Sequence, residues 1–192
     1  DPIPSRGLGD VYKRQQRWLT MNKLLICEIL QKTHSAKTKA EKVKILRNNN
    51  SQALRTIFII NFDESVVPRV PLGEDIPYTP NEAPMGTEHT NLLVEAKKAY
   101  YYFKGGAENL SNMKIESMFI RMLEGLYRDD AIVFIKAVNK SLHKKYRITK
   151  AVVEEAFPEI NWGNRSWASI LIQGKLKKLQ LKLMTISTSL MQ

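Results

Sequence analysis

The sequence is poor in the residues that build disulfides and metal sites. Cys27 is the single cysteine among 192 residues, and the histidines His34, His89 and His143 have no ligand-like spacing. One thiol excludes a disulfide framework within the chain and a cysteine-based zinc site. We therefore expect a protein of a reducing intracellular environment that holds no metal.

Long apolar runs are missing as well. No stretch approaches the roughly 18 apolar residues of a membrane-spanning helix, and the first residues lack the apolar core of a secretory signal. These absences predict a cytosolic protein with no membrane partner.

The motifs of several large enzyme classes are also absent. The chain contains no G-x-x-x-x-G-K-[ST], G-x-G-x-x-G, H-E-x-x-H or G-x-S-x-G. Asp129 and Asp130 are adjacent carboxylates, but neighbouring residues on a helix point apart, so a helix start explains them better than an acid–base pair. We expect no catalytic residue and no cofactor.

Helical periodicity dominates what is present. Apolar residues recur at helical spacing in seven segments, which begin near Met21, Ser35, Ser51, Glu88, Ser111, Asp129 and Thr149. The β-branched residues of 51–62 leave a strand there as the alternative. Five prolines between Pro68 and Pro84 exclude a lasting helix or central strand. The prediction is an all-α compact bundle of about six to seven helices, with a long proline-rich extended connection between the third and fourth.

The two ends of the chain differ in style from its middle. Residues 10–15, D-V-Y-K-R-Q, are the translation of GAT-GTG-TAT-AAG-AGA-CAG, which resembles the end sequence of a transposon used in preparing sequencing libraries. We expect residues 1–20 to be a non-native leader from a metagenomic assembly, with a natural disordered leader as the alternative. Residues 21–160 form the predicted helical module, and residues 161–192 form a basic tail, either disordered or frameshifted.

Charge is segregated along the sequence. Of the net charge of +11, residues 1–20 carry +2 and residues 161–192 carry +5, which leaves +4 for residues 21–160. Within this middle part, residues 23–55 carry +6 and residues 63–95 carry −6. Such segregation is what a one-sided binding surface requires.

The most basic short stretch lies between two predicted helices. Residues 136–150 contain no acidic residue and six basic ones, which are Lys136, Lys140, Lys144, Lys145, Arg147 and Lys150. Backbone amides at the helix start near Thr149 would lie beside this charge, which predicts a seat for a phosphate. The lysines of residues 37–44 have two open interpretations, a solvated helix face or phosphate contacts. The aromatic run 100–103 likewise either packs in the core or stacks on bases.

Two segments resemble a known DNA-binding domain. They are residues 38–63, T-K-A-E-K-V-K-I-L-R-N-N-N-S-Q-A-L-R-T-I-F-I-I-N-F-D, and residues 130–158, D-A-I-V-F-I-K-A-V-N-K-S-L-H-K-K-Y-R-I-T-K-A-V-V-E-E-A-F-P. The first resembles the opening, and the second the last helix pair, of the all-helical N-terminal domain of phage-type ATP-dependent DNA ligases. Residues 21–160 also resemble a family of short uncharacterised proteins from T-even-type tailed bacteriophages.

In the ligases, this domain holds duplex DNA by its backbone, largely from the minor-groove side and without sequence preference. The resemblance and the basic stretch together nominate these nucleic-acid-binding residues: Lys37, Lys39, Lys144, Lys145, Arg147, Thr149 and Lys150. The ligase pattern has a glycine where Arg147 falls in an ungapped match. The adenylation motif K-x-D-G is absent from the chain, as are the catalytic and oligonucleotide-fold domains, so ligation is not implied.

The resulting expectation is a non-catalytic phage accessory protein that binds double-stranded DNA through its phosphates, without sequence specificity. The alternative is a phage protein–protein interaction or virion-associated accessory protein that binds no DNA. Either would act in the cytoplasm of the infected bacterial host, with phage replication or virion proteins as further partners.

Overall fold

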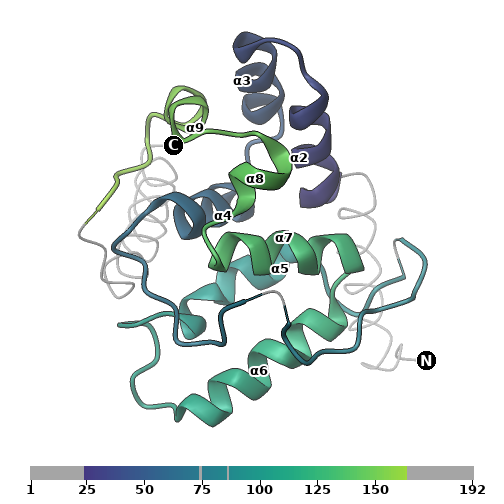
Figure 1. Cartoon of the computed structure of the whole chain (residues 1–192), viewed down its shortest axis with the longest axis vertical. Helices are drawn as coiled ribbons and strands as arrows, with labels where there is room; N and C mark the ends of the chain where they lie inside the picture. Colours follow the sequence, from purple (N-terminus) through teal and green to yellow (C-terminus); the bar gives the residue numbers. More distant parts are fainter. Residues whose placement is uncertain (1–23, 74, 86, 164–192) are drawn as a thin grey trace, which may run out of the picture.

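The structure is a computed structural model that describes residues 24–73, 75–85 and 87–163 (Figure 1). This part of the chain contains eight α-helices and one 3-10 helix, and its one β-type pairing is an isolated bridge between Pro68 and Phe103. The all-α prediction is confirmed. The predicted leader, residues 1–20, lies outside the described residues, as do residues 164–192 of the predicted basic tail.

Helices α2 (Ile26–Ser35) and α3 (Lys39–Asn48) form a hairpin with a short turn. Helix α2 begins at Ile26, later than the predicted start near Met21. The turn ends in a capping box, because the Glu41 N–H donates to Thr38 Oγ1 and the Thr38 N–H donates to the Glu41 carboxylate, both at 3.2 Å. Helix α3 ends at Asn48, and Asn49 caps it.

Helix α4 (Gln52–Phe62) begins after Ser51, whose Oγ accepts a hydrogen bond from the Leu54 N–H at 3.1 Å. The strand alternative for residues 51–62 is therefore wrong. The burial pattern explains why this segment is a helix although it contains β-branched residues, since Ile57 and Ile60 are fully buried beside Phe58. Core packing outweighs the β-propensity of these side chains.

The proline-rich connection follows α4 as an extended segment with no helix in its described residues, as predicted. Val70 and Ile76 are buried and anchor it to the helices. Arg69 fixes its first part, because the guanidinium donates to the carbonyl oxygens of Ala107 at 2.9 Å and Leu110 at 3.1 Å.

Helix α5 (Leu92–Glu95) is short and continues as the 3-10 helix η1 (Ala96–Tyr102). The predicted helix that begins near Glu88 is thus only partly α-helical. A tight turn ends it, and a Cβ on Gly106 would lie 1.9 Å from the Tyr100 carbonyl oxygen, so the turn requires glycine. Tyr102 and Phe103 are buried, which favours the core interpretation of the aromatic run.

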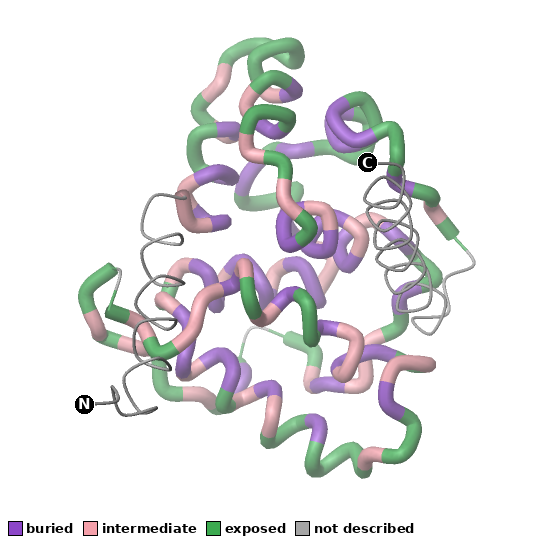
Figure 2. The backbone as a smooth tube through the Cα atoms, turned by 180° about the vertical axis from the view of Figure 1, so that it is seen from behind, coloured by how far each residue is buried: buried purple, intermediate pink, exposed green. Residues whose placement is uncertain are grey.

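Helices α6 (Asn112–Gly125) and α7 (Arg128–Val138) pack with η1 around three aromatic rings. The ring centroid of Tyr102 lies 5.3 Å from that of Phe119 and 6.1 Å from that of Phe134. Figure 2 shows buried residues on the inner sides of the helices throughout the molecule, in agreement with a single hydrophobic core.

Helices α8 (Leu142–Tyr146) and α9 (Lys150–Ala156) complete the described chain. The sequence predicted an uninterrupted link between the last two helices, and α8 forms inside that link, which raises the number of α-helices to eight in the described residues. In Figure 1, α8 and α9 lie with α2 and α3 at one end of the molecule, and α6 lies at the opposite end.

Candidate nucleic-acid interface

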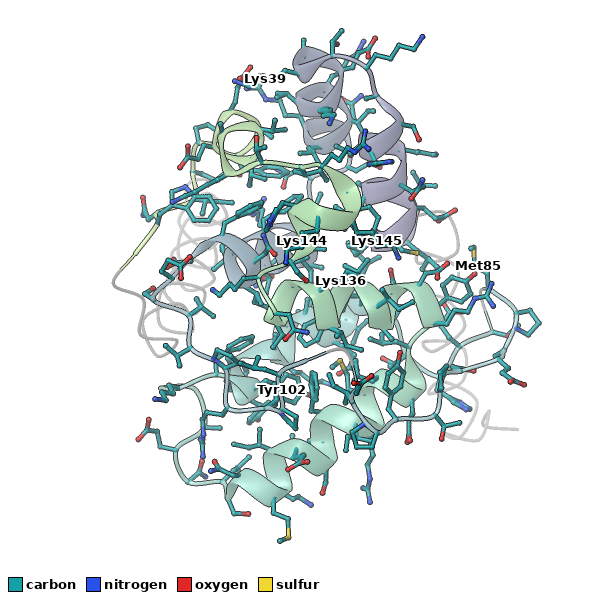
Figure 3. The ribbon with its side chains drawn as sticks, in the orientation of Figure 1. Lys39, Met85, Tyr102, Lys136, Lys144 and Lys145 are labelled. Carbon is teal, nitrogen blue, oxygen red and sulfur yellow. The ribbon has the colours of Figure 1, made fainter. Side chains whose placement is uncertain are left out.

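The start of α3 and the link between α8 and α9 lie side by side, although more than one hundred residues separate them. Lys42 Nζ donates to the Arg147 carbonyl oxygen at 3.0 Å, and Lys39 Nζ lies 2.7 Å from Glu155 Oε2. Figure 3 shows Lys39 beside α9, with Lys144 and Lys145 on α8. The fold therefore brings both groups of predicted residues to one end of the molecule.

Helix α8 is held from the core side. The Leu142 N–H donates to the buried Asn61 Oδ1 at 3.0 Å, so an α4 side chain satisfies an amide at the start of α8. Leu142 and Tyr146 are buried and anchor the helix. Lys144 and Lys145 occupy its exposed face, because the apolar positions of the helix point inward.

Arg147 ends α8 in a left-handed conformation, with φ 50° and ψ 37°. Its N–H donates to the His143 carbonyl oxygen at 3.0 Å, and its side chain is exposed. Glycine is the residue that adopts this conformation without steric cost. The backbone at this position is therefore shaped for glycine while the side chain supplies a positive charge.

Two of the predicted cations have carboxylate partners. Lys39 pairs with Glu155, and Lys150 Nζ lies 3.9 Å from Glu154 Oε1 and 4.9 Å from the centroid of the Trp162 ring. The hydrogen bond and charge of Lys39 lower the pKa of the Glu155 carboxyl. These pairs are exposed, so each contributes little to stability. Their acidic partners nevertheless reduce the positive charge of this face.

The other predicted cations have no carboxylate partner among the described residues. They are Lys37, Lys144, Lys145 and Arg147, of which Lys145 places Nζ 5.3 Å from the centroid of the Tyr146 ring. Thr149 begins α9, but its side chain makes no capping hydrogen bond, and the helix has only 7 residues. Side-chain charge is thus a stronger attraction for phosphate here than the helix start, and phosphate binding stays a prediction.

Three cations of the same region are missing from the nominated site residues, although phosphate contact was one of the two interpretations left open for the lysines of residues 37–44. Lys42 binds the Arg147 carbonyl oxygen, Arg47 Nη2 donates to the Glu155 carbonyl oxygen at 2.6 Å, and Lys44 is exposed. Their regular spacing on α3 was visible, but their relation to the α8–α9 link depends on packing between distant segments. No local pattern in the sequence contains that information.

The basic and acidic segments of the sequence also lie in different parts of the folded molecule. Residues 24–50 and 139–163, which include α2, α3, α8 and α9, carry eleven basic and five acidic side chains, a net of +6. Residues 63–137, which include α5, α6 and α7, carry eight basic and twelve acidic side chains, a net of −4. We call the first group the basic end of the molecule (Figure 1).

Asp130 has a different role from the one its sequence position predicts. It lies in the first turn of α7, but it is buried, and its Oδ1 accepts a hydrogen bond from the Cys27 N–H of α2 at 2.8 Å. Burial raises the pKa of the Asp130 carboxyl to about 6, and the Cys27 hydrogen bond opposes that shift. Burial and Asp130 together raise the pKa of the Cys27 thiol, which disfavours a nucleophilic thiolate.

The described residues contain neither a cluster of metal ligands nor a helix that could span a membrane. No group of three or more His, Cys, Asp or Glu side chains within residues 24–73, 75–85 and 87–163 is arranged to hold a metal ion. No helix in these same ranges has the length and apolar character needed to cross a bilayer.

Residues 29–144 match the sequence profile of a family described as a family of unknown function, DUF6433. The chain belongs to this family. The matched part runs from α2 to Lys144 in α8, so it contains Lys37 and Lys39 and ends before Lys145 and Arg147. Comparisons with curated proteins and with solved structures give no match.

Proposed function

We propose that this DUF6433 protein is a non-catalytic accessory protein of a tailed bacteriophage, and that it binds duplex DNA through the phosphate backbone without sequence specificity. The observation that carries the proposal is the basic end, where exposed cations without carboxylate partners come together from α3 and from the α8–α9 link. Phosphate contacts of this kind supply affinity without reading base sequence.

The resemblance to the ligase DNA-binding domain supports the same proposal at one specific position. The ligase pattern has glycine where this chain has Arg147, and Arg147 adopts the left-handed backbone that glycine favours. A shared turn geometry at this position is therefore compatible with the difference in residue type. The phage origin, the cytoplasm of the infected host and partners from phage replication or the virion are inferred from the resemblance alone.

The mechanism is electrostatic. Lys37, Lys144 and Arg147 project from exposed positions at the basic end, and each can replace a counterion on a phosphate. The net charge of −4 on residues 63–137 repels DNA from the remaining surface and orients the protein on the duplex.

The test is a fluorescence anisotropy titration of the full chain with labelled blunt duplex DNA at roughly 50 and 200 mM salt. We expect binding to weaken roughly 100-fold over this range and to be equal for unrelated sequences. Lys144→Glu plus Arg147→Glu should weaken low-salt binding by roughly 100-fold. Lys97→Glu plus Lys114→Glu makes the same charge change on exposed residues outside the basic end, and it should change affinity less than about threefold. Absent or salt-independent binding would refute the proposal.

The second candidate is a protein–protein interaction or virion-associated accessory protein that binds no DNA. The ion pairs Lys39–Glu155 and Lys150–Glu154 favour it, because they place acidic side chains on the face that DNA would approach. Co-purification with a phage replication or capsid protein, together with no affinity for duplex DNA, would select this candidate.

A further inference from the structure

A groove lies within the basic end. It has a volume of about 950 Å³ and lies along α2, with residues of α3 and α8 in its walls and Met85 of the proline-rich connection at its edge. Leu24, Ile45, Met85 and Tyr146 supply apolar surface. The volume is at the upper end of the range of about 300–1,000 Å³ that is usual for ligand sites.

Lysines with no carboxylate partner line this groove. Lys32 and Lys44 are exposed, and neither makes an ion pair or side-chain hydrogen bond with a described residue. Lys145 lies over the ring of Tyr146, at 5.3 Å from its centroid. These three cations come from three different helices, so the charge is distributed around the groove.

The carboxylates of the groove are already used at helix starts. Glu28 Oε2 accepts a hydrogen bond from the Leu25 N–H at 2.8 Å, and Glu41 Oε2 accepts one from the Lys37 N–H at 3.1 Å. Asp129 lies in the first turn of α7. Each is partly neutralised by the positive end of a helix, whereas the lysines are not. The groove is therefore able to accept an anion.

Neutral amides add a second kind of polar group. Gln31 and Asn48 are exposed in the groove, and neither side-chain amide has a hydrogen-bond partner among the described residues. A side-chain amide offers one acceptor and two donor hydrogens, which suits the edge of an unpaired nucleobase. The apolar surface of Leu24 and Ile45 suits the flat face of the same base.

We propose that this groove binds the unpaired nucleotides of a single-stranded DNA overhang, while the adjoining duplex lies on the other cations of the basic end, Lys37, Lys144 and Arg147. The inference rests on the proposed function and deepens it. Lys145 connects the two surfaces, because it follows Lys144 on α8 and also lines the groove. A duplex hides the flat faces and the Watson–Crick edges of its bases and shows only the remaining edges inside its grooves, so a recess with apolar walls and free amides is suited to unpaired bases.

The experiment compares a blunt duplex with the same duplex carrying a short overhang that contains a fluorescent adenine analogue. We expect the full chain to bind the overhang duplex roughly tenfold more tightly and to change the fluorescence of the analogue. Lys32→Ala plus Lys44→Ala removes two charges of the basic end as well, so it should weaken blunt-duplex binding, and it should weaken overhang binding further and thus abolish the preference. Gln31→Ala plus Asn48→Ala changes no charge, and it should also reduce the preference. Circular dichroism and urea unfolding verify that both variants are folded.

The outcomes separate this inference from the proposed function. Normal blunt-duplex binding without overhang preference, or with unchanged fluorescence of the analogue, would overturn the groove assignment alone. Equal competition by an acidic peptide and a single-stranded oligonucleotide would also overturn it, because the groove would then respond only to charge. Loss of blunt-duplex binding with retained overhang binding would remove the proposed function and leave the groove assignment standing.

Discussion

Asp130 and Arg147 each occupy a position that is costly for their residue type. Asp130 is a carboxylate in the core, and Arg147 is a side-chain-bearing residue at positive φ. Each of these residues also connects two segments that are distant in the sequence. Asp130 joins α7 to the start of α2, and the backbone of Arg147 joins the α8–α9 link to Lys42 of α3.

Asp130 makes stability depend on pH. Its folded pKa of about 6 lies above its ordinary value of 3.8, so the folded state holds this proton more tightly than the unfolded state. The carboxyl therefore contributes stability that is complete below the ordinary pKa and is lost as pH rises through 6. Asp130→Asn removes this titration. When the pH is lowered from about 7.5 to about 5, the free energy of unfolding of the wild type should therefore rise by roughly 1–2 kcal/mol relative to that of the variant.

Urea unfolding at the two pH values measures this difference. Asp129→Asn is the matched control on the half-buried neighbour, and it should follow the wild-type pH dependence. Parallel pH dependence of wild type and Asp130→Asn would show that the buried carboxyl does not titrate in this range.

The left-handed backbone at Arg147 predicts a change in stability that does not depend on the charge of its side chain. Arg147→Gly and Arg147→Ala both remove the guanidinium, but only glycine relieves the φ of 50°. The glycine variant should therefore be about 1 kcal/mol more stable than the alanine variant in urea unfolding. Both variants should lose duplex affinity to a similar degree. Equal stability of the two variants would indicate that the left-handed turn relaxes when the side chain is removed.

At the scale of elements, the position of α3 depends on its first turn. The reciprocal bonds between Thr38 and Glu41 fix where the helix begins, and Lys37 and Lys39 flank that point. Thr38→Ala should lower the free energy of unfolding by about 1 kcal/mol, because the Glu41 amide in the first turn loses its acceptor. Ser35→Ala, on an exposed residue at the end of α2, should change it by less than about 0.5 kcal/mol. Equal effects of the two substitutions would contradict a specific cap.

Helices with strong local signals were predictable from the sequence. Ser51 and Ser111 both cap helices where the sequence places them, with Oγ accepting from the Leu54 and Lys114 N–H groups. Prediction was weaker where tertiary contacts decide. Helix α8 owes its start to Asn61, which lies 81 residues away in the sequence. Asp130 likewise accepts a hydrogen bond from the Cys27 amide at the start of α2, although it lies in α7.

The candidate interface was predictable in composition and not in arrangement. The basic character of residues 136–150 was evident, but the acidic partners of Lys39 and Lys150 come into place through helix packing and helical spacing. The groove was not predictable either, because its walls come from α2, α3 and α8 and its edge from Met85.

At the scale of the whole molecule, the segregation of charge matters more than its total. Glu154 and Glu155 reduce the positive charge of the basic end most directly, because they lie on that end and pair with Lys150 and Lys39. Glu154→Gln plus Glu155→Gln raises the net charge of that end from +6 to +8.

This substitution should strengthen duplex binding, because it removes two negative charges and releases Lys39 and Lys150 for phosphate contacts. We expect roughly tenfold tighter binding at moderate salt and a steeper salt dependence, with the logarithmic slope larger by about 1–2. Glu82→Gln plus Glu116→Gln makes the same charge change on exposed residues within 63–137, so it should change duplex affinity by less than about twofold. A gain in affinity from both pairs would mean that net charge alone sets binding. No gain from the first pair would mean that DNA does not approach α9.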